Sequence, residues 1–320
     1  MANGLRNQYN TYSASQQLLP FDEATRCGLF SGIRQDALAG MRQMVDAIIS
    51  RQERGRSPRN RSLERGLNIL RVFRPGGSLR GNAEIAERTG LPRSTVSRLT
   101  QTLVASGFLE HDRRANAYRL GALVLGLAEA WIAGSDVLPV AVPLMKRASE
   151  KLKVNVGLAI ADEDEMVYLH AVRRRDIGVP RRVIIGRRIP MEGTSLGRAY
   201  LATLPFQDLR RLMARFRKRH SDSRWATIAQ EIRNSIAEVK KLGYCRADWL
   251  PGITAIATPV RVFGRTTYVV SLSTSTERCD DTTIRNELAP GLFELADALR
   301  KGLMEYGKRN MDQDAKNSAK

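Results

Sequence analysis

Apolar residues recur at helical spacing within the segment NAEIAERTGLPRSTVSRLTQTLVASGFL, which covers residues 82–109. In its second half, Val96, Leu99 and Leu103 stand at i, i+3 and i+7, so they share one face of a predicted helix. In its first half, a shorter helical pattern ends at Gly90, a residue type that adopts the left-handed conformation found at many helix C-termini. We therefore predict two short helices joined by a tight turn, a helix–turn–helix.

The other face of the second helix is basic and hydroxylated. A helix–turn–helix places such a helix in the major groove of DNA, where its first residues contact base edges and phosphates. The candidate DNA-binding residues of this helix are Arg93, Ser94, Thr95, Ser97, Arg98 and Gln101. An ordinary helical hairpin in an all-α core explains the same pattern, so this segment alone leaves two interpretations open.

Residues 108–120 contain two short apolar-edged segments around a polar turn at Arg113–Asn116, the pattern of a β-hairpin. Another helical pattern precedes the helix–turn–helix, over residues 62–73. Three helices followed by a hairpin predict a winged helix, and the hairpin is its wing. We expect the wing to contact the DNA backbone or minor groove through His111, Arg113 and Arg114, although a solvated turn would carry the same charges.

The pattern after the wing predicts a connector and a second domain. A helix is expected over residues 123–131 and another over 137–152. Alternating residues then predict strands over 154–160, 166–172 and 183–185, helices over 196–204, 206–219 and 224–242, strands over 253–262 and 267–272, and a last helix over 282–304. This order favours an α/β domain on a mainly antiparallel sheet, and hence an α+β chain overall.

Composition adds a partner to this picture. The net charge of +19 over 320 residues favours a polyanion, and we find neither a signal peptide nor an apolar run long enough to span a membrane. We therefore expect nucleic acid rather than a membrane surface as the partner, and a cytoplasmic protein. The cysteines, Cys27, Cys245 and Cys279, are too scattered for a disulfide framework or a metal site, and we expect no cofactor.

The segment Gly193–Gly197 satisfies G-x-S-x-G, the nucleophile elbow of α/β-hydrolases. That chemistry needs a long buried strand before the serine and a histidine after it. Here Ile189 and Pro190 come before it, and the one later histidine is His220, at the end of an arginine-rich helix. A serine hydrolase using Ser195 is thus the weaker alternative.

A binding site explains the same segment better. A helix that begins near Ser195 leaves backbone N–H groups unpaired in its first turn, and its dipole favours an anion such as a carboxylate. Ser271 and Ser273 share one face of a predicted strand, and their hydroxyls could complete the hydrogen bonding of a small acid. Solvent-facing serines are the simpler alternative for this strand.

From about Ser62 to Met304 the chain resembles the IclR family of bacterial transcriptional regulators. The resemblance rests on five segments in the family's order: RSLERGLNIL, AEIAERTGLPRSTVSRLTQTLVASGFL, YRLGALVLGLA, TSLGRAYLAT and PGITAIATPVRVFGR. It implies a winged-helix domain, a linker helix and an α/β effector-binding domain, assembled as a homodimer or homotetramer. A dimer would present two recognition helices to the halves of a pseudo-palindromic operator in double-stranded DNA.

The resemblance also implies an effector pocket. By position, its residues here are Thr194, Ser195, Gly197, Asp248, Trp249, Ala255, Ser271 and Ser273. The loop GYCRADWLPG departs from the family by being short, and Glu192 suits an anionic effector only if its side chain turns outward. The ATPV and STST segments resemble the subgroup that controls the breakdown of aromatic acids.

We therefore predict a ligand-responsive DNA-binding regulator of a catabolic operon, not an enzyme, whose effector is a small organic acid, in the narrower case an aromatic one. RNA polymerase is a further partner if the protein is an activator. A non-specific nucleic-acid-binding protein is the second alternative. The predicted parts are a mobile extension with one marginal helix (1–60, starting at Met1, Met41 or Met44), the winged helix–turn–helix (61–120), a linker helix (121–135), the effector-binding domain (136–307) and a disordered tail (308–320).

Overall fold

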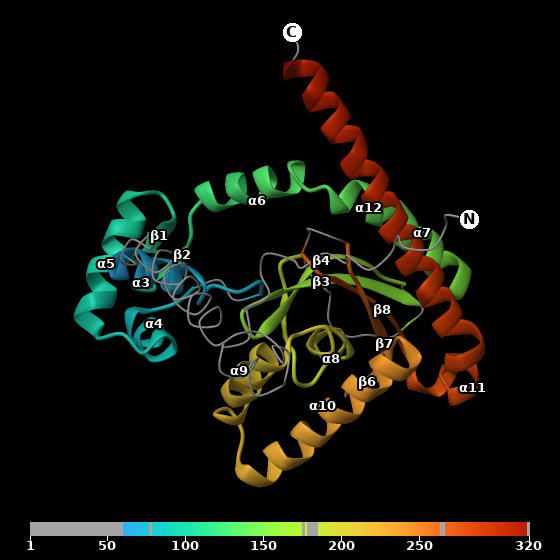
Figure 1. Ribbon diagram of the computed structural model, residues 1–320. Coiled ribbons are helices and arrows are strands. Elements are labelled where there is room, and N and C mark those ends of the chain that lie inside the picture. Colours follow the sequence, from blue (N-terminus) through green and yellow to red (C-terminus); the bar gives the residue numbers. More distant parts are fainter. Residues whose placement is uncertain (1–59, 77–78, 175–176, 178–184, 263–265, 319–320) are drawn as a thin grey trace, which may run out of the picture. The chain divides into compact units, whose positions relative to one another are not determined.

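The computed structural model describes residues 60–76, 79–174, 177, 185–262 and 266–318 (Figure 1). The chain divides into a unit of residues 1–64 and a unit of residues 65–320. Because the description begins at residue 60, the expected mobile extension and its marginal helix lie outside the described residues, as do the alternative start sites.

Three helices and a hairpin follow one another as predicted. They are α3 (Arg61–Leu70), α4 (Asn82–Thr89), α5 (Arg93–Ala105), β1 (Leu109–Asp112) and β2 (Ala117–Leu120). Gly90 ends α4 in the left-handed conformation, with φ at 67°. A small core, built from Ile69, Ile85, Val96 and Leu109 among others, holds the helices against the hairpin. The winged helix expected from the sequence is therefore present.

Two helices lead from the wing toward the second domain. Helix α6 (Leu123–Ala133) buries none of its residues, and Leu125 is 68% exposed. Helix α7 (Val137–Leu152) buries one face, which includes Ala141 and Met145. Within the described residues no single helix is long and apolar enough to cross a membrane; α6 and α7 reach that threshold only when joined, and they are bent by 77°.

The second domain is built on a six-stranded sheet in the order β5-β4-β3-β8-β7-β6, and every neighbouring pair is antiparallel. Its strands are β3 (Asn155–Asp162), β4 (Glu165–Val172), β5 (Arg188–Pro190), β6 (Cys245–Leu250), β7 (Ile253–Val260) and β8 (Tyr268–Ser275). The prediction covers neither β5 nor β6. The strand expected over 183–185 lies mostly outside the described residues, and the described strand β5 pairs with β4 from Arg188 to Pro190. Strand β6 forms where no strand was expected.

Helices cover both faces of this sheet (Figure 1). On one face, α7 and α12 (Ala289–Ser318) pack on Leu158, Val270 and Leu272. On the other, Ala159 and Val269 lie in a core with residues of the remaining helices, which are α8 (Ser195–Leu201), α9 (Phe206–Arg217) and α10 (Asp222–Leu242). The two apolar layers show that the sheet is buried on both sides.

The last helical region begins with the short helices η1 (Thr276–Arg278) and α11 (Asp281–Thr283) and a π-helical turn, η2 (Ile284–Leu288). Helix α12 then continues to Ser318, across most of the segment that the sequence analysis expects to be disordered. The segment EYGKRNMDQDAKNS contains no proline and one glycine, so nothing in it interrupts a helix that has already formed.

Candidate DNA-binding face and effector site

The candidate DNA-binding residues of α5 lie together on one side of the helix. A helix turns by 100° per residue, which places five of the six candidates within an arc of about 140°. Thr95 is the one that falls outside this arc. Within the arc, Arg93, Ser94, Arg98 and Gln101 are exposed. Val96 and Thr100 are fully buried beside this arc, next to Arg93 in projection, and the Thr100 hydroxyl donates to the carbonyl of Val96 at 3.0 Å. Packing thus fixes which side of α5 faces outward.

The cations of this face are available to a partner. Among the described residues, Arg93 and Arg98 make no ion pair, whereas Arg88 on α4 pairs with Glu84 at 2.9 Å. Unpaired guanidinium groups retain their full attraction for phosphates and guanine edges. Helix α5 thus carries two exposed arginines without an intramolecular ion pair among the described residues.

The wing has a fixed turn with two arginines at its tip. The Asp112 carboxylate accepts the backbone N–H groups of Arg114 and Ala115, both at 3.0 Å, which closes the turn. Arg113 and Arg114 are exposed, and neither makes an ion pair within the described part of the chain. His111 lies further back, stacked on Tyr118 with the ring centres 4.8 Å apart. The wing therefore presents Arg113 and Arg114 more directly than His111.

The candidate effector residues meet on the sheet face that α8 covers. Strand register places Asn155, Ser273, Ala255 and Ala247 side by side in one row across β3, β8, β7 and β6. A second row, in the same strand order, contains Gly157, Ser271, Ala257 and Cys245. We call these two rows the floor. Its side chains are small, and its polar groups gather on β3 and β8.

Helix α8 begins at the loop that follows β5. The Thr194 hydroxyl donates to the carbonyl of Pro190 at 2.7 Å and accepts the backbone N–H of Gly197 at 3.2 Å, so it caps the helix. Ser195 is buried, and its carbonyl accepts the Cys245 thiol at 3.5 Å. Burial raises the pKa of this thiol to about 12, which keeps it protonated as a donor. These contacts attach the start of α8 to the β6 end of the floor.

The charged groups beside α8 are turned away from the floor. Arg198 donates to the carbonyl of Glu192 at 2.9 Å and pairs with Glu231 on α10. The Glu192 carboxylate is buried, with Arg219 at 3.6 Å and His220 at 3.4 Å from the same oxygen. It is thus directed to the end of α9 rather than outward into solvent. The arrangement places His220 in an ion-pair cluster rather than in a catalytic triad.

Two predicted effector residues on β6 stand apart from the others. Asp248 is exposed and pairs with Arg246 at 3.0 Å, on the strand side opposite to the buried Ala247. Arg246 also pairs with Asp281 of α11, so Arg246 lies between the carboxylates of Asp248 and Asp281. The side chain of Trp249 lies outside the described residues. The structure therefore gathers Thr194, Ser195, Gly197, Ala255, Ser271 and Ser273, and separates Asp248 from them.

Sequence reasoning missed several residues of the floor. The missed residues are Asn155, Gly157, Ala247 and Ala257. They belong to the floor because β3 pairs with β8 and β6 pairs with β7, and β6 was not predicted. A signal for Asn155 was present, since a polar residue heads an otherwise apolar alternating strand. Alanine and glycine carry no such signal, because small residues occur on any face of a sheet.

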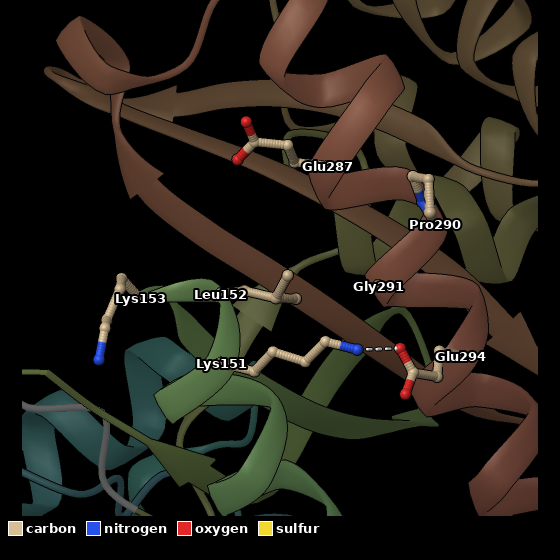
Figure 2. Close-up of a pocket in the computed structure, with 7 residues that line it drawn as sticks. All are labelled: Lys151, Leu152, Lys153, Glu287, Pro290, Gly291 and Glu294. Atoms are coloured by element: carbon tan, nitrogen blue, oxygen red, sulfur yellow. Dashed lines mark hydrogen bonds and ion pairs between the residues drawn. The ribbon is translucent and has the colours of Figure 1, made fainter.

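A separate hollow lies elsewhere in the second domain (Figure 2). It is an open groove of about 590 Å³ between the end of α7 and the region around the start of α12. Its lining carries both charges, from Lys151, Lys153, Glu287 and Glu294, and Lys151 pairs with Glu294 at 2.7 Å. This groove belongs to the helices that cover the other face of the sheet, so it is not part of the floor.

Two family models match the chain in the order of its domains. The IclR helix-turn-helix domain matches residues 62–113, and the bacterial transcriptional regulator IclR C-terminal domain matches residues 130–301, more than half of the chain. The chain belongs to the IclR family. It is therefore a ligand-responsive DNA-binding transcriptional regulator, not an enzyme, and the serine hydrolase alternative is wrong.

Relatives of this IclR-family chain span most of its length. It is 29% identical over 241 residues to the HTH-type transcriptional regulator TsaQ1/TsaQ2 of Comamonas testosteroni, covering 73% of this chain and 85% of the relative. It is 28% identical to the Pca regulon regulatory protein of Pseudomonas putida, covering 72% and 80%. An IclR-family regulator structure from Brucella abortus matches with a TM-score of 0.70 and 30% identity, covering 78% and 93%. These similarities agree with the expected winged helix and effector domain.

Proposed function

We propose that this regulator binds a pseudo-palindromic operator, with α5 in the major groove and the wing on the adjacent backbone. The observation that carries this proposal is the exposed face of α5, where Arg93 and Arg98 make no ion pair in the described part of the chain. Ser94, Thr95, Ser97 and Gln101 would add contacts to bases or phosphates. Arg113 and Arg114 would hold the wing on the phosphate backbone.

Replacing Arg98 tests the DNA-binding half of the proposal. If Arg98 contacts a base in bidentate fashion, Arg98→Ala weakens operator binding by about 1–3 kcal/mol and relaxes sequence preference at one position. Arg88→Ala is the matched control, because Arg88 already pairs with Glu84 on α4. Titration of both variants at one salt concentration gives the comparison. Equal affinities would remove Arg98 from the interface, and equal binding to all duplexes would favour a non-specific nucleic-acid-binding protein.

The proposed effector is a small organic acid bound between α8 and the floor. The hydroxyls of Ser271 and Ser273, together with the buried start of α8 at Ser195, supply hydrogen bonds. Ala255, beside Ser273 on β7, has only a methyl side chain. Aromatic acids are the first class to test, because the ATPV and STST segments resemble the subgroup that controls the breakdown of aromatic acids. A fold relative of 22% identity, an IclR homologue from Microbacterium hydrocarbonoxydans, has 4-hydroxybenzoate bound.

A hydroxyl deletion tests the effector half. Ser273→Ala should weaken acid binding by about 0.5–1.5 kcal/mol while operator affinity without the acid stays unchanged. Ser223→Ala on the exposed start of α10 is the control. Calorimetry with 4-hydroxybenzoate, followed by operator titration with and without it, separates the two effects. Unchanged acid binding in Ser273→Ala would exclude this hydroxyl from the site.

The remaining parts of the proposal concern organisation. We infer a winged helix–turn–helix over residues 61–120, a linker over 121–135 and an effector-binding domain from residue 136, in a homodimer or homotetramer working in the cytoplasm. The exposed apolar residues of α6, including Leu125 and Trp131, support association of two copies. The target would be a catabolic operon, and RNA polymerase would be a direct partner if the protein activates it.

A further inference from the structure

Asn155 has one half of its carboxamide engaged and the other half unpaired. It begins β3 and is only 5% exposed. Its Oδ1 accepts the backbone N–H of Arg174 at 2.8 Å, and its Nδ2 has no hydrogen-bond partner among the described residues. Because only the oxygen of the amide can accept a hydrogen bond, the Arg174 contact fixes the orientation of the group. The unpaired atom is therefore a donor.

The side chain of Asn155 belongs to the floor. Ser273 stands directly opposite it on β8, and Ala255 continues the same row on β7. Gly157, two residues along β3, faces Ser271. A β-carbon on Gly157 would lie 2.8 Å from the Tyr168 ring and 2.9 Å from the Ser271 hydroxyl oxygen, so the Tyr168 ring from β4 and the Ser271 hydroxyl already occupy the space above this glycine. Donors from β3 and β8 thus lie side by side in the row of Asn155 and Ser273, while the Tyr168 ring covers Gly157 in the second row.

A desolvated donor without a partner discriminates among ligands. A ligand that brings an oxygen to it gains a hydrogen bond without any new cost of burying the donor, since the protein has already buried it. A ligand that lacks this oxygen leaves the donor unpaired and binds more weakly. This property is absent from an exposed asparagine, where water replaces the missing partner.

We propose that Asn155 is a specificity-determining residue of the effector site, whose Nδ2 donates to a hydroxyl or oxo oxygen of the effector. The effector is then a hydroxylated or oxo acid rather than a simple carboxylic acid. This inference rests on the proposed function, because it assumes that an acid binds over the floor. It adds the chemical class of that acid and a residue that the family resemblance did not supply.

The test compares acids that differ by one hydroxyl. The probes are 4-hydroxybenzoate against benzoate and lactate against propionate, measured by calorimetry on the full chain. Asn155→Asp keeps the oxygen that accepts from Arg174 and replaces the donor by a second acceptor. Asn155→Ser has no group long enough to reach the ligand and covers the case in which the buried carboxylate prevents folding. Asn234→Asp makes the same charge change on the exposed surface of α10.

We expect the wild-type protein to prefer the hydroxylated member of at least one pair by about 10- to 100-fold. The ratio of the two affinities should fall close to one in both Asn155 variants and should persist in Asn234→Asp, whose operator affinity without acid should equal that of the wild type. A preference retained in the Asn155 variants would overturn the assignment of Asn155 and leave the acid site intact. Binding of none of the four acids by the wild type would overturn the proposed effector class, and this inference with it.

Discussion

Gly197 occupies the point where α8 passes closest to the chain before it. A β-carbon at this position would lie 2.1 Å from Cα and 2.2 Å from the carbonyl oxygen of Met191, both backbone atoms that no side-chain rotation can move. The second glycine of the G-x-S-x-G pattern is therefore explained by packing. A nucleophilic serine is not needed to account for it.

This close approach predicts a stability difference between two neighbouring glycines. Gly197→Ala should lower the free energy of unfolding by at least about 1–3 kcal/mol, because the backbone around Met191 must move. Gly193→Ala is the matched control, since a β-carbon there meets nothing within 4 Å. Urea unfolding of the two variants measures the difference. Equal stabilities would show that α8 does not approach Met191 this closely in solution.

The buried thiol of Cys245 predicts a loss of stability at alkaline pH. Burial raises its pKa from 9.0 to about 12, so the unfolded chain loses this proton at lower pH than the folded one. The free energy of unfolding should then fall as pH rises from about 9 toward 12, by at most about 1.4 kcal/mol per pH unit. Cys245→Ala should remove this part of the pH dependence in urea titrations.

Tyr168 provides an internal comparison for the alkaline titration. Burial raises the pKa of its hydroxyl from 10.0 to about 12, so its contribution begins about one pH unit later. Tyr168→Phe should therefore leave the initial fall above pH 9 in place and reduce the later one. A stability profile that is flat in the wild type up to pH 11 would contradict both assignments.

Helix α6 has an apolar sequence, but none of its residues is buried. Its apolar residues, including Leu125 and Trp131, are exposed, although a helix of this composition normally packs on something. We expect Leu125→Glu to lower the molar mass of the oligomer measured by light scattering, because it places a charge in the proposed interface between copies. Phe206→Glu, at an exposed apolar position on α9, should leave the mass unchanged.

The elements also show how far the sequence leads. The α5 helix and the wing were predicted closely because local spacing determines them: Val96, Leu99 and Leu103 mark one helix face, and a polar turn separates the hairpin strands. The floor could not be predicted in full, because it depends on which strands pair. In strand β6 the buried residues Cys245 and Ala247 are small, so their alternation with Arg246 and Asp248 is a weak sequence signal for a strand.

On the scale of the whole molecule, net charge overstates the positive surface available to DNA. Several arginines of α9 and the segment after it are paired with carboxylates: Arg211 with Asp208, Arg217 with Asp222, and Arg219 with Asp164. The arginines of α5 and the wing tip make no such pairs in the described part of the chain. The arginines of α5 and of the wing tip are therefore free to meet DNA phosphates, whereas these three arginines of the second domain are partly neutralised.

This distribution predicts which arginines set the salt dependence of operator binding. The double variant Arg113→Ala/Arg114→Ala should reduce the slope of log K against log salt by about 0.9 for each phosphate that the wing no longer neutralises. Arg217→Ala should leave the slope unchanged, because its charge is already met by Asp222. Titrations at several salt concentrations decide this. An equal reduction in both variants would mean that the second domain also binds the duplex.

The small side chains of the floor bear on how the ligand preference of this protein can change. Its alanines, serines and glycine face α8, while the alternate residues of the same strands fill the separate core under α7 and α12. A change of one methyl group at Ala255 or Ser271 would alter the shape offered to a metabolite and leave that second core untouched. A lineage, or an engineer building a biosensor, could thus move from one metabolite to another in single steps while keeping the same operator.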